Sequence, residues 1–140
     1  MIIIQQTGIQ QNGIQETRTA RSQPELSALV IAHNEQAHLA ACLERLDFAD
    51  ELVVMLDRCS DSSVEIASAF TANLHEGAWE DEGVRRMAGR KQCKGRWILE
   101  IDADERVTPA LALEIRAAIE SDPDCFFLIP VDNYIGTRLV

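Results

Sequence analysis

The sequence lacks the long apolar run that a membrane-spanning helix needs. No stretch approaches the roughly 20 apolar residues that cross a bilayer, and the opening residues 1–4 carry no cation that would mark a secretory signal. Cysteine is scarce, with four residues and no C-x-x-C pair, which disfavours a zinc site and suits reduced thiols. These absences predict a cytoplasmic protein without a transmembrane segment.

Glycine and positive charge are also in short supply. The loop after the first predicted strand contains no glycine, so the G-x-G-x-x-G and G-x-x-x-x-G-K-[ST] motifs are both absent. This disfavours a hydride-transfer enzyme and an NTPase. The 13 basic residues face 23 acidic ones, and the resulting net charge of −10 argues against nonspecific binding to nucleic acid. Nucleic acid is therefore not an expected partner.

What is present suits one α/β domain. Residues 1–25 hold six glutamines and little apolar periodicity, so we predict a flexible N-terminal extension. From residue 26 to residue 140, short apolar runs alternate with helical patterns, which predicts a mostly parallel sheet flanked by helices. The predicted strands are 26–32, 51–56, 73–75, 97–101 and 125–130. A capping box of Ser62 and Glu65 should begin one helix, another should cover 82–94 up to Gly95, and a third should begin at Thr108-Pro109.

Charged residues directly follow three of these strands. They are residues 33–35, Asp57 and residues 102–105. Ligands of open parallel sheets bind at the carboxyl ends of the strands. The carboxylates of Asp102 and Asp104 should leave the strand on one side, roughly 7 Å apart, and should repel each other unless a cation lies nearby. A divalent metal that carries a phosphate group would fit, whereas a solvated turn is the competing interpretation.

A basic cluster lies just before the acidic motif. It holds six of the 13 basic residues, and either a polyanionic ligand or a solvated helix face would explain it. A nucleotide could be held by Asp57 at its base or ribose, by Arg86 at its phosphates and by a metal at Asp104 bridging the diphosphate. Mg²⁺ or Mn²⁺ suits such an oxygen-ligated site. The cluster consists of Arg85, Arg86, Arg90, Lys91, Lys94 and Arg96.

Three runs resemble a known family. They are residues 29–35 (LVIAHNE), 51–61 (ELVVMLDRCSD) and 95–107 (GRWILEIDADERV). They are similar to the family-2 glycosyltransferases, which have a Rossmann-like GT-A fold, and in particular to the branch of lipopolysaccharide-core and cell-envelope sugar transferases. The resemblance implies that residues 26–140 form a nucleotide-sugar-binding domain.

The resemblance also implies roles for individual residues. The end of the first strand would line the nucleoside pocket, Asp57 would contact base or ribose, and Arg86 would lie near the base or diphosphate. Asp102 would approach the ribose or the metal, and Asp104 would bind the metal. The implied nucleotide-sugar-binding residues are Ala32, His33, Glu35, Asp57, Arg86, Asp102 and Ala103, and the implied metal ligands are Asp104 and Asp102.

The implied reaction transfers a sugar from a nucleoside-diphosphate donor to a sugar or lipid-linked acceptor, with Mg²⁺ or Mn²⁺ as cofactor. In this family the acceptor segment and the general base would follow about Tyr134, so we assign no catalytic base and expect only the donor-binding part of a C-terminally truncated domain. The alternative is a nucleotide-sugar-binding module or fragment without transfer activity. An aspartyl phosphatase is disfavoured, because Arg106 stands where that motif needs Thr or Val. Peripheral association with the inner face of the membrane stays open.

Overall fold

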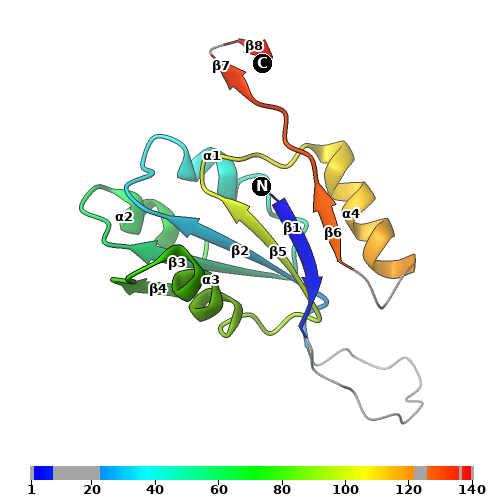
Figure 1. Ribbon diagram of the computed structural model, residues 1–140, viewed down its shortest axis with the longest axis horizontal. Helices are drawn as coiled ribbons and strands as arrows, with labels where there is room; N and C mark the ends of the chain where they lie inside the picture. Colours follow the sequence, from blue (N-terminus) through cyan, green and yellow to red (C-terminus); the bar gives the residue numbers. More distant parts are fainter. Residues whose placement is uncertain (1, 8–22, 122–125, 136, 140) are drawn as a thin grey trace.

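The computed structural model describes residues 2–7, 23–121, 126–135 and 137–139. Its core is a six-stranded sheet with strand order β4-β3-β2-β5-β1-β6 (Figure 1). Four neighbouring strands, β2 to β5, run parallel, and β1 is antiparallel to both of its neighbours. The strands are β1 (Ile2–Gln6), β2 (Leu26–Ala32), β3 (Glu51–Asp57), β4 (Leu74–Gly77), β5 (Trp97–Asp102) and β6 (Phe127–Ile129).

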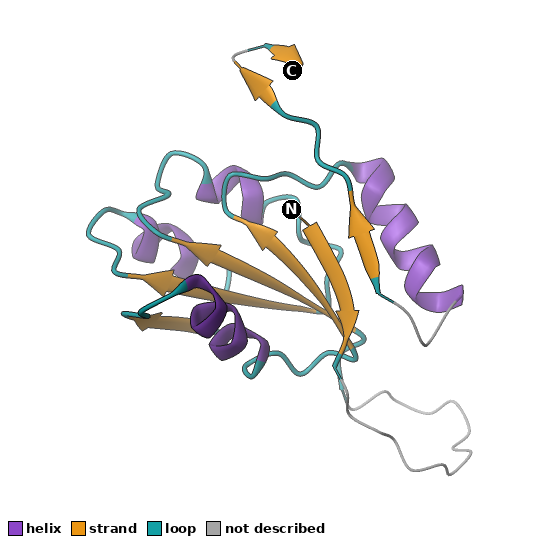
Figure 2. Ribbon diagram, viewed as in Figure 1, coloured by secondary structure: helices purple, strands orange, loops and turns teal. Residues whose placement is uncertain are grey.

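Helices cover both faces of this sheet, as Figure 2 shows. They are α1 (Leu39–Leu43), α2 (Ser63–Ser68), α3 (Glu82–Arg90) and α4 (Pro109–Ser121), and a small hairpin of β7 (Tyr134–Ile135) and β8 (Arg138–Leu139) follows the sheet. The predicted α/β fold with a mostly parallel, helix-flanked sheet is confirmed. Among the described residues, no helix is long and apolar enough to cross a bilayer.

The two faces of the sheet bury different clusters. Alternate residues of β2, among them Ala28 and Val30, pack with α1, α2 and α4 in the larger core. The residues between them, Leu29 and Ile31, face the smaller cluster under α3. Because both faces are covered, all seven residues of β2 are buried, and the strand reads in the sequence as a continuous apolar run.

The predicted flexible extension is wrong for its first residues. Strand β1 lies inside the sheet, with Ile2 and Ile4 only 2% and 1% exposed. Its partners are distant in sequence, since Ile3 lies opposite Glu100 and Leu128, and no local pattern could reveal them. Residues 8–22 of the predicted extension lie outside the described residues.

Helix ends differ from two predictions. Helix α3 ends at Arg90, and Gly95 is needed for close packing instead, because a Cβ there would lie 2.5 Å from the Ser27 nitrogen. The predicted capping box is also wrong, since Ser62 makes no side-chain cap bond and the Asp61 carboxylate accepts the Ser63 N–H at 3.0 Å. Some predictions hold: the Thr108 hydroxyl caps α4 by accepting the Leu111 N–H at 3.1 Å.

Candidate functional site

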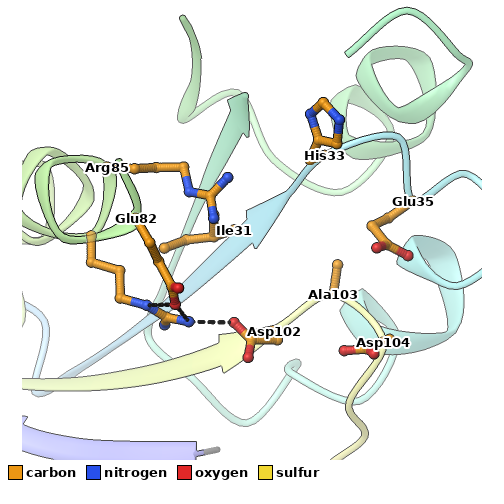
Figure 3. A pocket seen from close by; sticks show the side chains of 9 residues that line it. Ile31, His33, Glu35, Glu82, Arg85, Asp102, Ala103 and Asp104 are labelled. Carbon is orange, nitrogen blue, oxygen red and sulfur yellow. Dashed lines mark hydrogen bonds and ion pairs between the residues drawn. The ribbon is translucent and has the colours of Figure 1, made fainter. Parts of the chain in front are cut away.

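A pocket opens at the carboxyl ends of β2 and β5, beside α3 (Figure 3). Its volume is about 260 Å³, and six of the residues singled out in the sequence line it. The charged strand ends meet here because the parallel strands β2 and β5 end at the same edge of the sheet. The complete lining is Ile31, His33, Glu35, Glu82, Arg85, Arg86, Asp102, Ala103 and Asp104.

Carboxylates form one wall of the pocket. Asp102 is the last residue of β5, and the exposed Asp104 follows the buried Ala103 on the turn beyond the strand. Figure 3 shows that Glu35, on the loop after β2, faces the same pocket. Within the described part of the chain, no group of three or more His, Cys, Asp or Glu side chains is arranged to hold a metal ion. Mg²⁺ and Mn²⁺ commonly use one or two carboxylates plus substrate phosphates, and the Asp102–Asp104 pair suits that habit.

Arg86 lines the pocket beside Asp102 and is strongly anchored. Its Nη2 donates to Asp102 Oδ1 at 2.8 Å, its Nη1 donates to Glu100 Oε1 at 3.2 Å, and its Nε donates to Glu82 Oε1 at 2.8 Å. Burial alone would lower the Arg86 pKa, but the hydrogen bonds with Glu82 and Asp102 outweigh it and raise the pKa. The guanidinium is therefore always charged, and its direction is fixed by three carboxylates.

Two further groups of this network have no role of their own in the resemblance. Glu100 is 0% exposed although it lies in the middle of β5, and its Oε2 accepts from Arg90 Nε at 2.6 Å. Arg85 lines the pocket, and its Nη1 donates to Asp57 Oδ2 at 2.8 Å. Arg85 and Arg90 both belong to the basic cluster seen in the sequence. The sequence pattern does not say which carboxylate of the sheet each arginine contacts.

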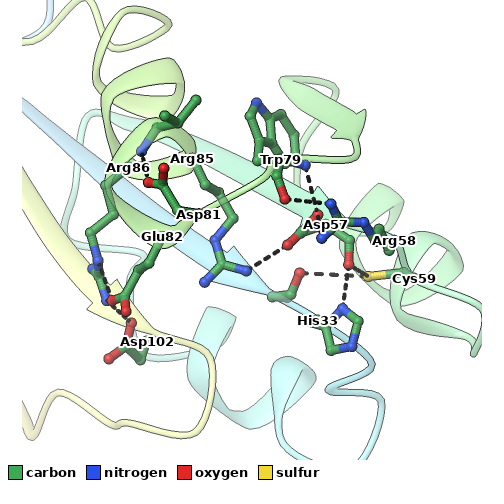
Figure 4. Close-up of polar contacts among 12 residues, drawn as sticks. His33, Asp57, Arg58, Cys59, Trp79, Asp81, Glu82, Arg85, Arg86 and Asp102 are labelled. Carbon is green, nitrogen blue, oxygen red and sulfur yellow. Dashed lines mark hydrogen bonds and ion pairs between the residues drawn. The ribbon is translucent and has the colours of Figure 1, made fainter.

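Asp57 reaches the pocket only through Arg85. Its side chain is 7% exposed. The carboxylate also accepts the Trp79 N–H, at 3.2 Å. Figure 4 draws both the Arg85 and the Trp79 contacts. Burial pushes the pKa of the Asp57 carboxyl up, but the bonds from Trp79 and Arg85 and the nearby Arg58 cation hold it below its ordinary value. Asp57 is thus an ionised support for Arg85.

The loops after β2 and β3 are tied together beside the pocket. His33 Nδ1 lies 2.6 Å from the Asp57 carbonyl oxygen, and Asn34, with φ of 54°, accepts the Ser60 N–H at 2.8 Å. The left-handed backbone at Asn34 turns the chain sharply, so the next residue, Glu35, can face the pocket. Ala32, the last residue of β2, is 1% exposed and lies in the core.

Comparison with known proteins agrees with this geometry. Residues 27–139 match the sequence profile of Glycosyl transferase family 2. The chain belongs to this family. The family-2 chain is 33% identical over 91 residues to the lipopolysaccharide core biosynthesis glycosyltransferase LpsC of Rhizobium meliloti, which covers 61% of the chain and 34% of LpsC. An uncharacterized glycosyltransferase of Rickettsia bellii is 32% identical, over 64% of the chain and 31% of that protein.

Solved structures show the same fold. S. aureus TarS (residues 1–349) superposes on the family-2 chain with a TM-score of 0.57 and 23% identity, covering 69% of the chain and 32% of TarS. The structure of TarS 1–349 in complex with UDP gives a TM-score of 0.55 with 24% identity, over 67% of the chain and 31% of that structure. The chain thus spans about one third of the length of these relatives.

Proposed function

We propose that the pocket binds the nucleoside-diphosphate sugar donor of a glycosyltransferase that acts in cell-envelope polysaccharide or lipopolysaccharide synthesis. The observation that carries the proposal is that two aspartates, Asp102 and Asp104, and two arginines, Arg85 and Arg86, line one pocket at the carboxyl end of a parallel sheet. Membership of the family supports sugar transfer, the name of LpsC supports a cell-envelope product, and the UDP complex of TarS supports a nucleotide-linked donor.

The charge of the pocket supports a divalent metal as cofactor. Four carboxylates and only two guanidinium groups line it, so the lining is negative before any ligand arrives. A diphosphate would add further negative charge, and the resulting repulsion favours binding together with a cation. In this proposal Asp104, assisted by Asp102, holds Mg²⁺ or Mn²⁺. The metal would stabilise the negative charge that develops on the departing diphosphate.

The other residues of the pocket orient the donor. Arg86 is held at the pocket by three carboxylates, which keep its charge near the position proposed for the diphosphate. Asp57, through Arg85, and His33 support the nucleoside end, and Glu35 lies beside them. Residues 26–140 would form the nucleotide-sugar-binding domain. The proposed setting is cytoplasmic, at the inner face of the membrane, with a sugar or lipid-linked acceptor.

Thermal unfolding with a panel of UDP, GDP and CDP, each with and without Mn²⁺, tests donor binding. One nucleotide should raise the melting temperature only when Mn²⁺ is present, and at about 100 times Kd the added stability is about 2.7 kcal/mol. Asp104→Ala should abolish this metal-dependent shift without lowering the melting temperature of the free protein. Asp47→Ala, at another exposed aspartate in the turn after α1, is the matched control and should keep the shift. Failure of all three nucleotides with Mn²⁺ would contradict the proposal.

Transfer itself is a separate step with its own measurement. The expected reaction without acceptor is slow hydrolysis of the nucleotide sugar that binds, followed as free sugar. Turnover that disappears in Asp104→Ala supports a transferase. Binding without any turnover, in the presence of candidate acceptors as well, would favour the alternative of a nucleotide-sugar-binding module.

A further inference from the structure

Strand β1 occupies a slot inside the family domain although its own sequence lies outside it. The family match covers residues 27–139, which include both β5 and β6, whereas β1 is Ile2–Gln6. In Figure 1, β1 lies between β5 and β6, and it pairs antiparallel with both. Neighbouring strands lie about 4.8 Å apart, so without β1 the strands β5 and β6 would be separated by a gap one strand wide.

One face of β1 fits the core of the domain. Ile2 and Ile4 are 2% and 1% exposed and pack in the same cluster as Ile115 and Ile119 of α4. Beyond the strand, the Thr7 N–H donates to the Arg96 carbonyl oxygen at 2.9 Å, which continues the pairing toward the start of β5. The slot therefore accepts an extended antiparallel segment with apolar side chains at alternate positions.

The opposite face of β1 reaches the pocket through a buried carboxylate. Gln5 Nε2 donates to Glu100 Oε2 at 3.4 Å, and the same carboxylate accepts from Arg90 and Arg86 at 2.6 and 3.2 Å. Arg86 in turn donates to Asp102 in the pocket. A continuous series of side chains thus joins β1 to the arginine that faces the acidic motif.

We propose that β1 is a complementing strand, supplied by sequence outside the matched domain, that completes the sheet and positions Arg86 through Glu100. The occupant of the slot is this chain's own segment of residues 1–7. Gln5 is a positioning residue that contacts Glu100 and not the pocket. The influence on donor binding rests on the proposed function, whereas the complementation of the sheet does not.

Two opposite charges at position 5 test the positioning role in the intact chain. Gln5→Glu sets a second carboxylate against Glu100, which should draw the arginines out of place and weaken the metal-dependent nucleotide binding about fivefold, the size of coupling within one charged network. Gln5→Lys offers Glu100 a cation and should keep the affinity within about twofold. A strand with only a structural role would treat both variants alike, so equal affinities for the two would overturn the positioning role.

Strand exchange tests the complementation without any nucleotide. The full chain carries a protease site placed within residues 8–22 and is cut after purification. A fluorescent peptide of residues 1–7 should then exchange into the cut protein and raise its anisotropy, whereas the peptide with Ile2→Asp and Ile4→Asp should not. Removal of the cut segment should lower the melting temperature, and fresh peptide should restore it.

The outcomes separate the two proposals. An unchanged melting temperature after removal of the segment, or a loss of fold that fresh peptide does not restore, overturns the complementing strand. Exchange of the peptide in a protein that binds none of the nucleotides leaves the strand proposal standing and removes the donor-binding one. Metal-dependent nucleotide binding in a protein that does not exchange the peptide leaves the donor-binding proposal standing and removes the strand proposal.

Discussion

The two ends of the parallel strands both carry carboxylates, but the amino-end carboxylates accept more bonds from the backbone. At the amino end, Asp50 accepts the backbone N–H groups of Glu25 and Leu26 at 3.1 and 2.9 Å, and it also pairs with Arg116 at 2.8 Å. Glu51 accepts the Lys94 N–H at 2.7 Å and the Ser27 hydroxyl. Backbone donors cannot leave without unfolding the chain, so these carboxylates are part of the architecture.

At the carboxyl end the partners that face the pocket are long side chains. Asp57 is held by Arg85 and Asp102 by Arg86, each at 2.8 Å, and both arginines also face the pocket. A guanidinium can exchange one anion for another with little backbone movement. The comparison teaches that the donors of a carboxylate, rather than its burial alone, separate the structural end of this sheet from the end proposed to bind the donor. Changes at the amino end should therefore act on stability, and changes at the carboxyl end on binding.

The largest loss of stability should come from Gly95→Ala at the amino end. The new Cβ would lie 2.5 Å from the Ser27 nitrogen and 2.6 Å from its hydroxyl oxygen, so the start of β5 must move away from β2. We expect a loss of about 3 kcal/mol in the free energy of unfolding, measured in urea. Gly83→Ala is the control, since its Cβ would meet only Asp81 Oδ1 at 3.3 Å. Equal losses of unfolding free energy in the two variants would contradict the explanation by close packing at Gly95.

Glu51→Ala should come next. It leaves the Lys94 N–H and the Ser27 hydroxyl without their acceptor, which should cost about 2 kcal/mol of unfolding free energy. Nucleotide affinity, measured by titration at a temperature where the variant is folded, should stay within about twofold. If Glu51→Ala instead lost nucleotide affinity and kept its full unfolding free energy, the amino end would not be the purely structural end of the sheet.

Asp57→Asn should have a smaller effect that depends on pH. The folded-state pKa of Asp57 lies below the ordinary value of 3.8, so its ionised form stabilises the fold above that pH, and this contribution is lost as the pH falls through the lower folded-state pKa. The variant should be less stable by about 1 kcal/mol near neutral pH, and the difference should shrink below 3.8. Urea unfolding from about pH 6 to about pH 3 measures it. A difference that grows on acidification would contradict the assignment.

The smallest effect on stability should come from Asp104→Ala. Asp104 is exposed on the turn beyond β5, so its removal should change the free energy of unfolding by less than about 0.5 kcal/mol. The same variant should lose metal-dependent binding, and this contrast with Glu51→Ala is the sharpest form of the comparison. Circular dichroism melts of the two variants, run beside nucleotide titrations, measure both quantities.

Much of the fold and most of the pocket could be predicted from the sequence. The run from Leu26 to Ala32 is apolar at nearly every position because both faces of β2 are covered, and such runs identify strands directly. Parallel strands end at one edge, so charged residues after β2 and β5 had to meet. The structure brings His33, Glu35 and Asp104 together as that reasoning requires.

The remaining features depend on contacts between distant segments. The sequence shows Glu100 only as one charged residue within an apolar strand. Its contacts come from distant segments, namely the arginines of α3 and Gln5 of β1. Arg85 and Arg86 are adjacent in sequence, and only the docking of α3 shows that each pairs with a different carboxylate. Strand β1 is not predicted because its apolar run covers only residues 2–4 and its partners lie far away in sequence, in β5 and β6.

The position of β1 also sets an order of events during synthesis. Gln5 and its partner Glu100 are 95 residues apart, so β1 leaves the ribosome long before β5 does. At about 5 to 20 residues per second, the three consecutive isoleucines of β1 remain unpaired for roughly 5 to 20 seconds. An apolar, β-branched segment waiting that long is exposed to aggregation and is a natural target for a chaperone. Strand β1, which is made before β5 and β6, would thus be among the last to be paired.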